Sequence, residues 1–201
     1  MEELLSTFVR SIFVDNMIFA YYLGMCSFLA VSKNVKTALG LGMAVTFILT
    51  CTLPINYMLE NYVLKEGALQ WLGAEFAGVN LSFLAFIIFI AIIASFTQLV
   101  EKFAPALYAS LGIFLPLIAV NCAILGGSLF MQQKAFPNVG VATVYGLGSG
   151  IGWMLAIVGM AAIREKLAYS DIPKPLKGLG ITFIITGLMG MAFMCFSGLK
   201  I

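Results

Sequence analysis

LGIFLPLIAVNCAILGG, residues 111–127, is the stretch from which the rest of the chain can be interpreted. It carries no charged residue, yet it places a polar amide, Asn121, and a thiol, Cys122, inside an apolar segment. Gly112, Pro116 and a later glycine pair interrupt it. Glycine and proline break helices within a membrane and free backbone groups that must find partners. The stretch therefore predicts a broken membrane helix with a polar group at the break.

The composition places the whole chain in a membrane. Hydrophobic residues make up 62% of the 201 residues and charged residues only 10%, whereas a soluble domain is about a quarter charged. Each charge-free run reaches, or nearly reaches, the roughly 20 residues that cross a bilayer. Six such runs occupy residues 16–32, 37–59, 76–100, 103–133, 135–163 and 178–199. We expect an all-α integral membrane protein, a single domain over residues 1–201 with six transmembrane helices.

The charges near the ends of these runs predict an orientation. Glu2 and Glu3 stand where a signal peptide would carry basic residues, so we expect the first segment to be retained. Lysine and arginine number seven on one side of the predicted membrane and four on the other, the smaller group being Arg10, Lys65, Lys134 and Lys200. The positive-inside rule then places both termini outside, in the periplasm of a bacterium with an inner membrane.

The ionisable and metal-binding residues narrow the possible chemistry. The chain has no histidine, which excludes histidine-ligated haem and the commonest general base. Its four cysteines, Cys26, Cys51, Cys122 and Cys195, all fall inside predicted spans, so a disulfide framework is not indicated. We interpret Cys51 and Cys195 as packing residues.

The other two cysteines indicate an internal repeat. Cys26 lies in the first span and Cys122 in the fourth, and each of these spans precedes one with close glycines, Gly40/Gly42 and Gly146/Gly148. Because three spans is an odd number, two three-span halves must cross the membrane in opposite directions. We expect an inverted three-plus-three repeat with halves of residues 1–102 and 103–201, and with broken first and fourth helices.

Each polar residue in these breaks has two interpretations. Cys26 and Cys122 are either small packing residues or half of a metal site, because two thiolates cannot complete a four-thiolate iron–sulfur shell without a second chain. Asn16 and Asn121 either satisfy backbone groups at the helix breaks or line an ion path. Asp15 has the same ambiguity, and we place it at the membrane interface.

The glycine-rich stretch VYGLGSGIGWM predicts close helix packing. Gly146, Gly148, Gly150 and Gly152 form small-xxx-small pairs that let a neighbouring backbone approach. Ile151 stands where a dinucleotide fingerprint would need its last glycine, so nucleotide binding is not indicated.

Several long motifs resemble one family of membrane electron-transfer subunits. They are LGMCSFLAVSK (residues 23–33), residues 111–127, VYGLGSGIGWMLAIV (144–158), IREKLAYSDIPKPLKGLGITFI (163–184) and GLMGMAFMCFSG (187–198). Together they resemble the membrane subunits of the sodium-translocating NADH:quinone oxidoreductase (Nqr) and of the related Rnf complex. Ser27 and the glycines before Trp153 are more similar to the Nqr members.

The resemblance implies a cofactor and partners. Two homologous six-helix subunits of opposite topology would together hold a two-iron, two-sulfur (2Fe-2S) cluster, each giving two cysteines. On this chain they would be Cys26 and Cys122, opposite a homologous partner, the D subunit. The A, B, C and F subunits would complete a translocase that passes electrons from NADH to ubiquinone and exports sodium, with flavins on neighbouring subunits.

We therefore expect a subunit that is not catalytic alone, embedded in lipid and without a nucleic-acid partner. The alternatives are a subunit of an Rnf-type ferredoxin:NAD oxidoreductase, a redox-inactive inverted-repeat channel or transporter, and a packing scaffold with incidental cysteines.

Overall fold

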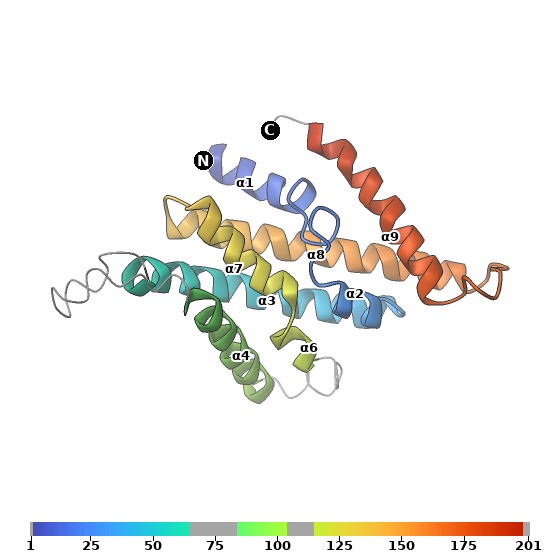
Figure 1. The fold of residues 1–201 in the computed structure, drawn as a ribbon, viewed down its shortest axis with the longest axis horizontal. Helices are drawn as coiled ribbons and strands as arrows, with labels where there is room; N and C mark the ends of the chain where they lie inside the picture. The colour runs from blue at the N-terminus through green and yellow to red at the C-terminus, as the bar shows by residue number, and fades with distance from the viewer. Residues whose placement is uncertain (1, 65–83, 104–114, 199–201) are drawn as a thin grey trace.

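The computed structural model describes residues 2–64, 84–103 and 115–198, and these are helical with short connections (Figure 1). The first part contains α1 (Glu2–Phe13), α2 (Met25–Val31) and α3 (Val35–Leu59), which continues into the π-helical turn η1 (Glu60–Leu64). Then follow α4 (Ala85–Phe103), α6 (Leu115–Ala119), α7 (Cys122–Lys134), α8 (Val139–Leu167), α9 (Leu179–Met194) and the 3₁₀ turn η6 (Cys195–Gly198). The prediction of an all-α protein is confirmed.

Five segments of the described residues are long and apolar enough to cross a membrane. They are Val35–Leu64, Ala85–Phe103, Pro116–Lys134, Val139–Leu167 and Leu179–Gly198. They correspond to five of the six predicted spans, although residues 76–83, 104–114 and 199 of those spans lie outside the described part. The protein is thus a multi-pass membrane protein.

The first predicted span is broken near its start. Residues 16–32 were expected to be helical, but α1 ends at Phe13 and α2 begins only at Met25. Asn16 explains part of the difference, because its side-chain oxygen accepts hydrogen bonds from the backbone amides of Ile18 and Phe19. Asparagine competes with helix formation in this way. The predicted break is confirmed, and it extends over residues 14–24 rather than leaving a continuous helix from residue 16.

The fourth predicted span is also broken, and among the described residues the break lies at the predicted polar group, Asn121, rather than at Pro116 or the glycine pair. Gly112 lies outside the described residues, and Pro116 is in the first turn of α6, where proline costs no hydrogen bond. The break falls at Val120 and Asn121, directly before α7. Gly126 and Gly127 do not end a helix, because both lie inside α7. Gly126 packs against Leu23.

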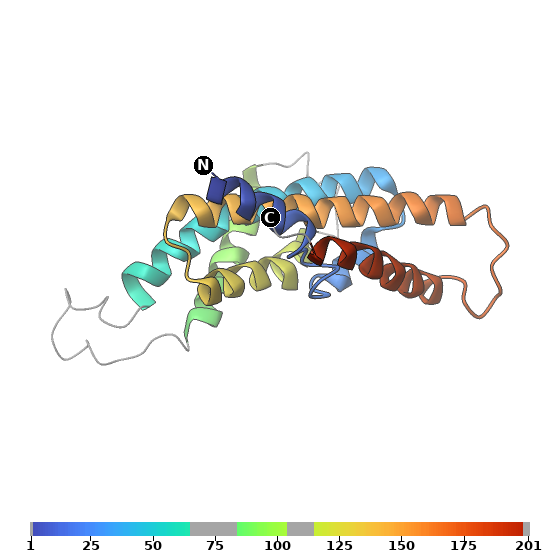
Figure 2. The same ribbon diagram turned by 90° about the horizontal axis from the view of Figure 1, so that it is seen from above.

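The centre of the molecule is the antiparallel pair α3 and α8, which run side by side in both views (Figures 1 and 2). Glycines allow this approach from both helices: a Cβ atom on Gly42 would collide with Met154, and one on Gly150 would lie 2.6 Å from Thr46 Cα. On another face of α8, a Cβ on Gly152 would lie 2.8 Å from Ile12 O of α1. The predicted role of the glycine-rich stretch in close packing is confirmed.

Two helices lie at the periphery of this core. The apolar windows of α4 and α9 are each only 17% buried, compared with 50% and 56% for the windows containing α3 and α8. Their exposed side chains are large and apolar, among them Phe86, Ile87, Phe183 and Leu188. In a membrane, such surfaces are suited to contact with lipid or with neighbouring apolar helices.

Candidate functional site

The two helix breaks meet at Gly24. This residue has a left-handed backbone conformation, with φ +79°, and immediately precedes α2. A Cβ atom placed on it would lie 2.8 Å from Asn121 Oδ1 and 3.0 Å from the Cβ of Ala123. Only glycine combines this conformation with so close an approach at little cost. We call this contact between Gly24, Asn121, Ala123 and Trp153 the break junction.

Both predicted metal ligands stand next to the break junction. Cys26 is two residues after Gly24 in α2, and Cys122 lies between Asn121 and Ala123 as the first residue of α7. Both cysteines are exposed on the surface of this chain, and neither is in a disulfide. The structure therefore brings together the two segments that carry these thiols and leaves both open to a partner.

Asn121 begins α7 as its N-cap. Its Oδ1 accepts a hydrogen bond of 3.0 Å from the amide of Ala123, one of the free donors at the start of the helix. This supports the interpretation that Asn121 satisfies the backbone. Its Nδ2 atom is buried and makes no hydrogen bond with the described residues, and the same is true of the indole Nε1 of Trp153. The Trp153 nitrogen would also be 2.8 Å from a Cβ on Gly24.

Two buried N–H donors without acceptors thus lie at the junction from which both cysteine helices start. Leaving such donors unpaired costs about 1–3 kcal/mol each, so a nearby acceptor would stabilise the protein. Sulfide and thiolate are acceptors, and hydrogen bonds to the sulfurs raise the reduction potential of an iron–sulfur cluster. The two donors are therefore compatible with a sulfur-containing group beside them, and N–H donors cannot themselves coordinate a sodium ion, which binds oxygen atoms.

The far end of α2 is held by Arg164 of α8. Its Nη1 donates to the carbonyl of Leu29 at 3.1 Å and to the hydroxyl of Ser32 at 2.7 Å. Leu29 is in the last turn of α2, where carbonyls lack helical partners and where positive charge is favourable. The neighbouring Glu165 accepts from the amide of Val35, the first residue of α3, at 2.9 Å. This adjacent pair of opposite charges caps the two helices that flank residues 32–34, and so fixes the C-terminal end of the short helix that carries Cys26.

Asn16 braces the first break. Its Nδ2 donates to Ile12 O at 3.0 Å and to Gly152 O at 2.9 Å, and its Oδ1 accepts the two amides described above. The side chain is fully buried. Because both of its polar atoms already have protein partners, the geometry supports the backbone-satisfying role of Asn16 rather than a place in an ion path.

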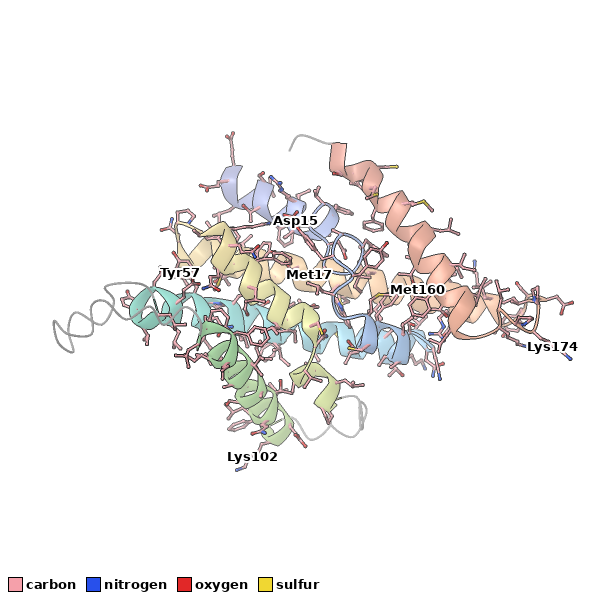
Figure 3. The ribbon with its side chains drawn as sticks, viewed as in Figure 1. Asp15, Met17, Tyr57, Lys102, Met160 and Lys174 are labelled. Carbon is pink, nitrogen blue, oxygen red and sulfur yellow. The ribbon has the colours of Figure 1, made fainter. Side chains whose placement is uncertain are left out.

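Asp15 lies just after the end of α1 (Figure 3). It forms an ion pair with Lys134. Its carboxylate accepts from Lys134 Nζ at 2.6 Å and lies 3.6 Å from Arg10 Nε. Asp15 is only 8% exposed. The partners are cations of this chain, and they account for a carboxylate so well shielded from water.

The other two cysteines are set apart by position. Cys51 is half-buried in the middle of α3, and Cys195 is exposed in η6 after α9. Among the residues that the structure describes, no three histidine, cysteine, aspartate or glutamate side chains form a metal-binding group. A complete iron–sulfur ligand set would accordingly need thiols from a second chain.

Sequence reasoning missed three residues of the site. Gly24 was not singled out, although a glycine before a cysteine near a predicted break is a signal for a left-handed residue. In the sequence, Arg164 contributes only to the count of positive charges on one side of the membrane, and Trp153 only to the similarity with the Nqr members. Arg164 contacts α2, and Trp153 lies beside Gly24; each pair joins segments more than 100 positions apart in the chain, which no local pattern encodes.

The fold and the junction define a class: a multi-pass helical membrane protein in which two interrupted helices present a pair of surface thiols. Comparison with known proteins identifies the family. The model of the Rnf-Nqr subunit membrane proteins matches residues 4–200, and this chain belongs to that family.

Individual relatives align over their whole length. The chain is 54% identical to the E subunit of the Na(+)-translocating NADH-quinone reductase of Rhodopirellula baltica, with 100% of this chain and 99% of the relative covered. It is 55% identical to the E subunit of the same reductase from Proteus mirabilis and 56% identical to that of Psychromonas ingrahamii, with full coverage of both chains in each case.

Proposed function

We propose that this chain is an electron-transfer subunit in which Cys26 and Cys122 are two of the four thiolate ligands of an intramembrane 2Fe-2S cluster. The chain is a subunit of a Na+-translocating NADH-quinone reductase. A homologous partner, the D subunit, supplies the other two ligands, and the A, B, C and F subunits complete the enzyme. The chain has no catalytic activity of its own.

The observation that carries the proposal is the break junction. It brings the segments of Cys26 and Cys122 into contact even though these residues are 96 positions apart. Cys195 is exposed too, so it is the shared position of Cys26 and Cys122, together with their exposure, that distinguishes them from the other cysteines. The scaffold interpretation leaves this shared position without a cause.

The residues around the thiols suit them to bind iron. When bound, the cluster would supply a site that accepts and releases single electrons. Cys122 is the first residue of α7, where the free backbone amides and the helix dipole attract negative charge, such as that of an iron–sulfur cluster. Arg164 and Gly24 hold α2, and with it Cys26, in a fixed position. Trp153 offers a buried N–H donor at the same junction.

We also propose that the two halves are related as an inverted repeat. The glycine-bearing helices that follow the two cysteine helices, α3 and α8, pack against each other through Gly42 and Gly150. Such a mutual contact is expected of equivalent helices near a pseudo-two-fold axis. The D subunit would then have the opposite topology and complete the ligand set across the interface. The flavins are on neighbouring subunits, and both termini face the periplasm from the cell inner membrane.

Besides the packing scaffold, the other two alternative functions also receive less support than the proposed one. In a channel or transporter for cations, oxygen atoms would line the junction, but its free buried groups are the N–H donors of Asn121 and Trp153. An Rnf-type subunit is less well supported because the chain is 54–55% identical to E subunits of Na(+)-translocating NADH-quinone reductases.

The test is iron and acid-labile sulfide analysis of the purified whole complex. Cys26→Ala and Cys122→Ala are each expected to remove two iron atoms and two sulfides per complex, the content of one 2Fe-2S cluster. Cys51→Ala is the matched control, because it changes a cysteine of the same chain outside the junction. Full retention of iron and sulfide in an assembled Cys122→Ala complex would refute the proposal.

A further inference from the structure

A polar pocket lies away from the cysteines, where α1, the end of α7 and the start of α8 come together. Its volume is about 330 Å³, and its polar lining consists of Ser6, Thr7, Arg10, Asp15, Lys134 and Tyr145. These residues come from three segments of the chain. None of them contributes to the proposed cluster site.

The charges of this pocket do not balance. The Asp15 carboxylate faces two cations, Lys134 at 2.6 Å and Arg10 at 3.6 Å. One carboxylate against two cations leaves a net positive charge. Arg10 can bind a further anion. Its side chain is 61% exposed and only its Nε approaches Asp15, whereas a guanidinium has five N–H donors. Glu3 is on the same side of α1, two turns before Arg10, but its side chain is exposed and it makes no ion pair among the described residues.

A second, independent observation points to a ligand. The hydroxyl of Tyr145 is buried and lies near the hydroxyl of Ser149, but neither group makes a well-formed hydrogen bond among the described residues; Tyr145 lines the pocket and is only 1% exposed. Its ring lies under Lys134, whose Nζ is 4.8 Å from the ring centroid. A buried hydroxyl without a partner costs stability, and an acceptor oxygen in the pocket would satisfy it.

The position of the pocket indicates where such an acceptor comes from. Lys134 is the last residue of one apolar span, and Val139 begins the next. The pocket is therefore at the boundary between hydrocarbon and water, the depth of the phosphate groups of a bilayer. Lysine, arginine and tyrosine at this depth are typical of contacts with anionic headgroups.

We propose that this pocket binds the phosphate group of an anionic phospholipid. Arg10 and Lys134 hold the phosphate oxygens, and the Tyr145 hydroxyl donates to one of them, while Asp15 keeps Lys134 in place. Free inorganic phosphate has the same binding chemistry, and the experiment below separates the two sources. The proposal is independent of the iron–sulfur cluster.

The experiment measures lipid binding to the delipidated whole complex by native mass spectrometry. Phosphatidylglycerol, phosphatidylcholine or inorganic phosphate is titrated into the wild type and three variants. Arg10→Gln leaves the Asp15–Lys134 pair intact, Tyr145→Phe removes only the hydroxyl, and Lys174→Gln is the control, since Lys174 is exposed in the loop before α9 (Figure 3).

The wild type and Lys174→Gln are expected to bind one phosphatidylglycerol molecule with the same affinity. Arg10→Gln is expected to bind it roughly tenfold more weakly, because one charge-assisted hydrogen bond is lost. Tyr145→Phe is expected to weaken this binding by roughly fivefold, as for one neutral hydrogen bond. Displacement of this lipid by inorganic phosphate would support the phosphate chemistry with a soluble source. Equal phosphatidylglycerol binding by the wild type and Arg10→Gln, or equal binding of phosphatidylcholine, would overturn the proposal.

Discussion

Gly24→Ala is the substitution that tests the break junction most sharply. Alanine in a left-handed conformation costs roughly 1–2 kcal/mol. Its Cβ would also lie 2.8 Å from Asn121 Oδ1 and from Trp153 Nε1. Neither atom can yield easily, because Asn121 caps α7 and Trp153 is fully buried. Overpacking of this kind costs about 1–3 kcal/mol, so we expect a total destabilisation of about 2–5 kcal/mol.

The strain should move α2 away from α7 and thereby change the spacing of Cys26 and Cys122. We expect the purified complex with Gly24→Ala to lose most of its 2Fe-2S signal in the electron paramagnetic resonance (EPR) spectrum and to dissociate at a lower temperature. The signal is the more informative readout, since it reports the position of the two thiols.

Gly178→Ala is the matched control. Gly178 also has a positive φ, +104°, but a Cβ at this position would meet nothing within 4 Å. The backbone strain is therefore present without the clash at the junction, and the iron–sulfur signal is expected to remain. The reasoning fails if Gly24→Ala keeps the full signal, or if both glycine variants lose it equally.

Three further predictions concern the elements that hold the junction. Asn16→Ala leaves two backbone amides and two carbonyls without their partner, and we expect a loss of about 3 kcal/mol or more in the stability of the complex, measured by thermal unfolding; an unchanged midpoint would show that water replaces the side chain. Gly150→Ala places a Cβ 2.6 Å from the backbone of Thr46, so α3 and α8 must separate at a cost of about 1–3 kcal/mol, visible in the same assay, whereas Gly187→Ala, with nothing within 4 Å, should be neutral. Arg164→Gln removes a cationic cap from α2, so it should broaden the EPR signal and lower the stability of the complex by about 1–2 kcal/mol. Arg164→Lys keeps the charge and should largely preserve both the signal and the stability. Identical effects of the two substitutions would argue against a capping role.

Much of the fold could be predicted from the sequence because bilayer thickness and hydrophobicity act on each span separately. The spans around α3, α4, α7, α8 and α9 were found from charge-free length alone. The positions of the breaks could not be found in this way. They depend on tertiary contacts, such as the hydrogen bond between Asn16 and Gly152 O, which joins residues 136 positions apart.

The candidate site was only partly accessible from the sequence. The spacing of Cys26 and Cys122 suggested that they belong together, because equivalent positions in a repeat meet near its axis. Asn121 was correctly placed at the break in the fourth span, but Pro116 does not cause this break, since proline is tolerated in the first turn of α6 and the N-cap asparagine begins the next helix. The role of Arg164 depends on where α8 ends relative to α2, which follows from the packing of α8 on α3 and α1.

The central claim is that Cys26 and Cys122, and not the other cysteines of this chain, hold half of a shared 2Fe-2S cluster. The most direct measurement is the EPR spectrum of the reduced, purified complex with each of the four cysteines replaced by alanine in turn. Cys26→Ala and Cys122→Ala are expected to abolish the signal of this cluster, and Cys51→Ala and Cys195→Ala are expected to preserve it. An undiminished signal in either of the first two variants would contradict the claim.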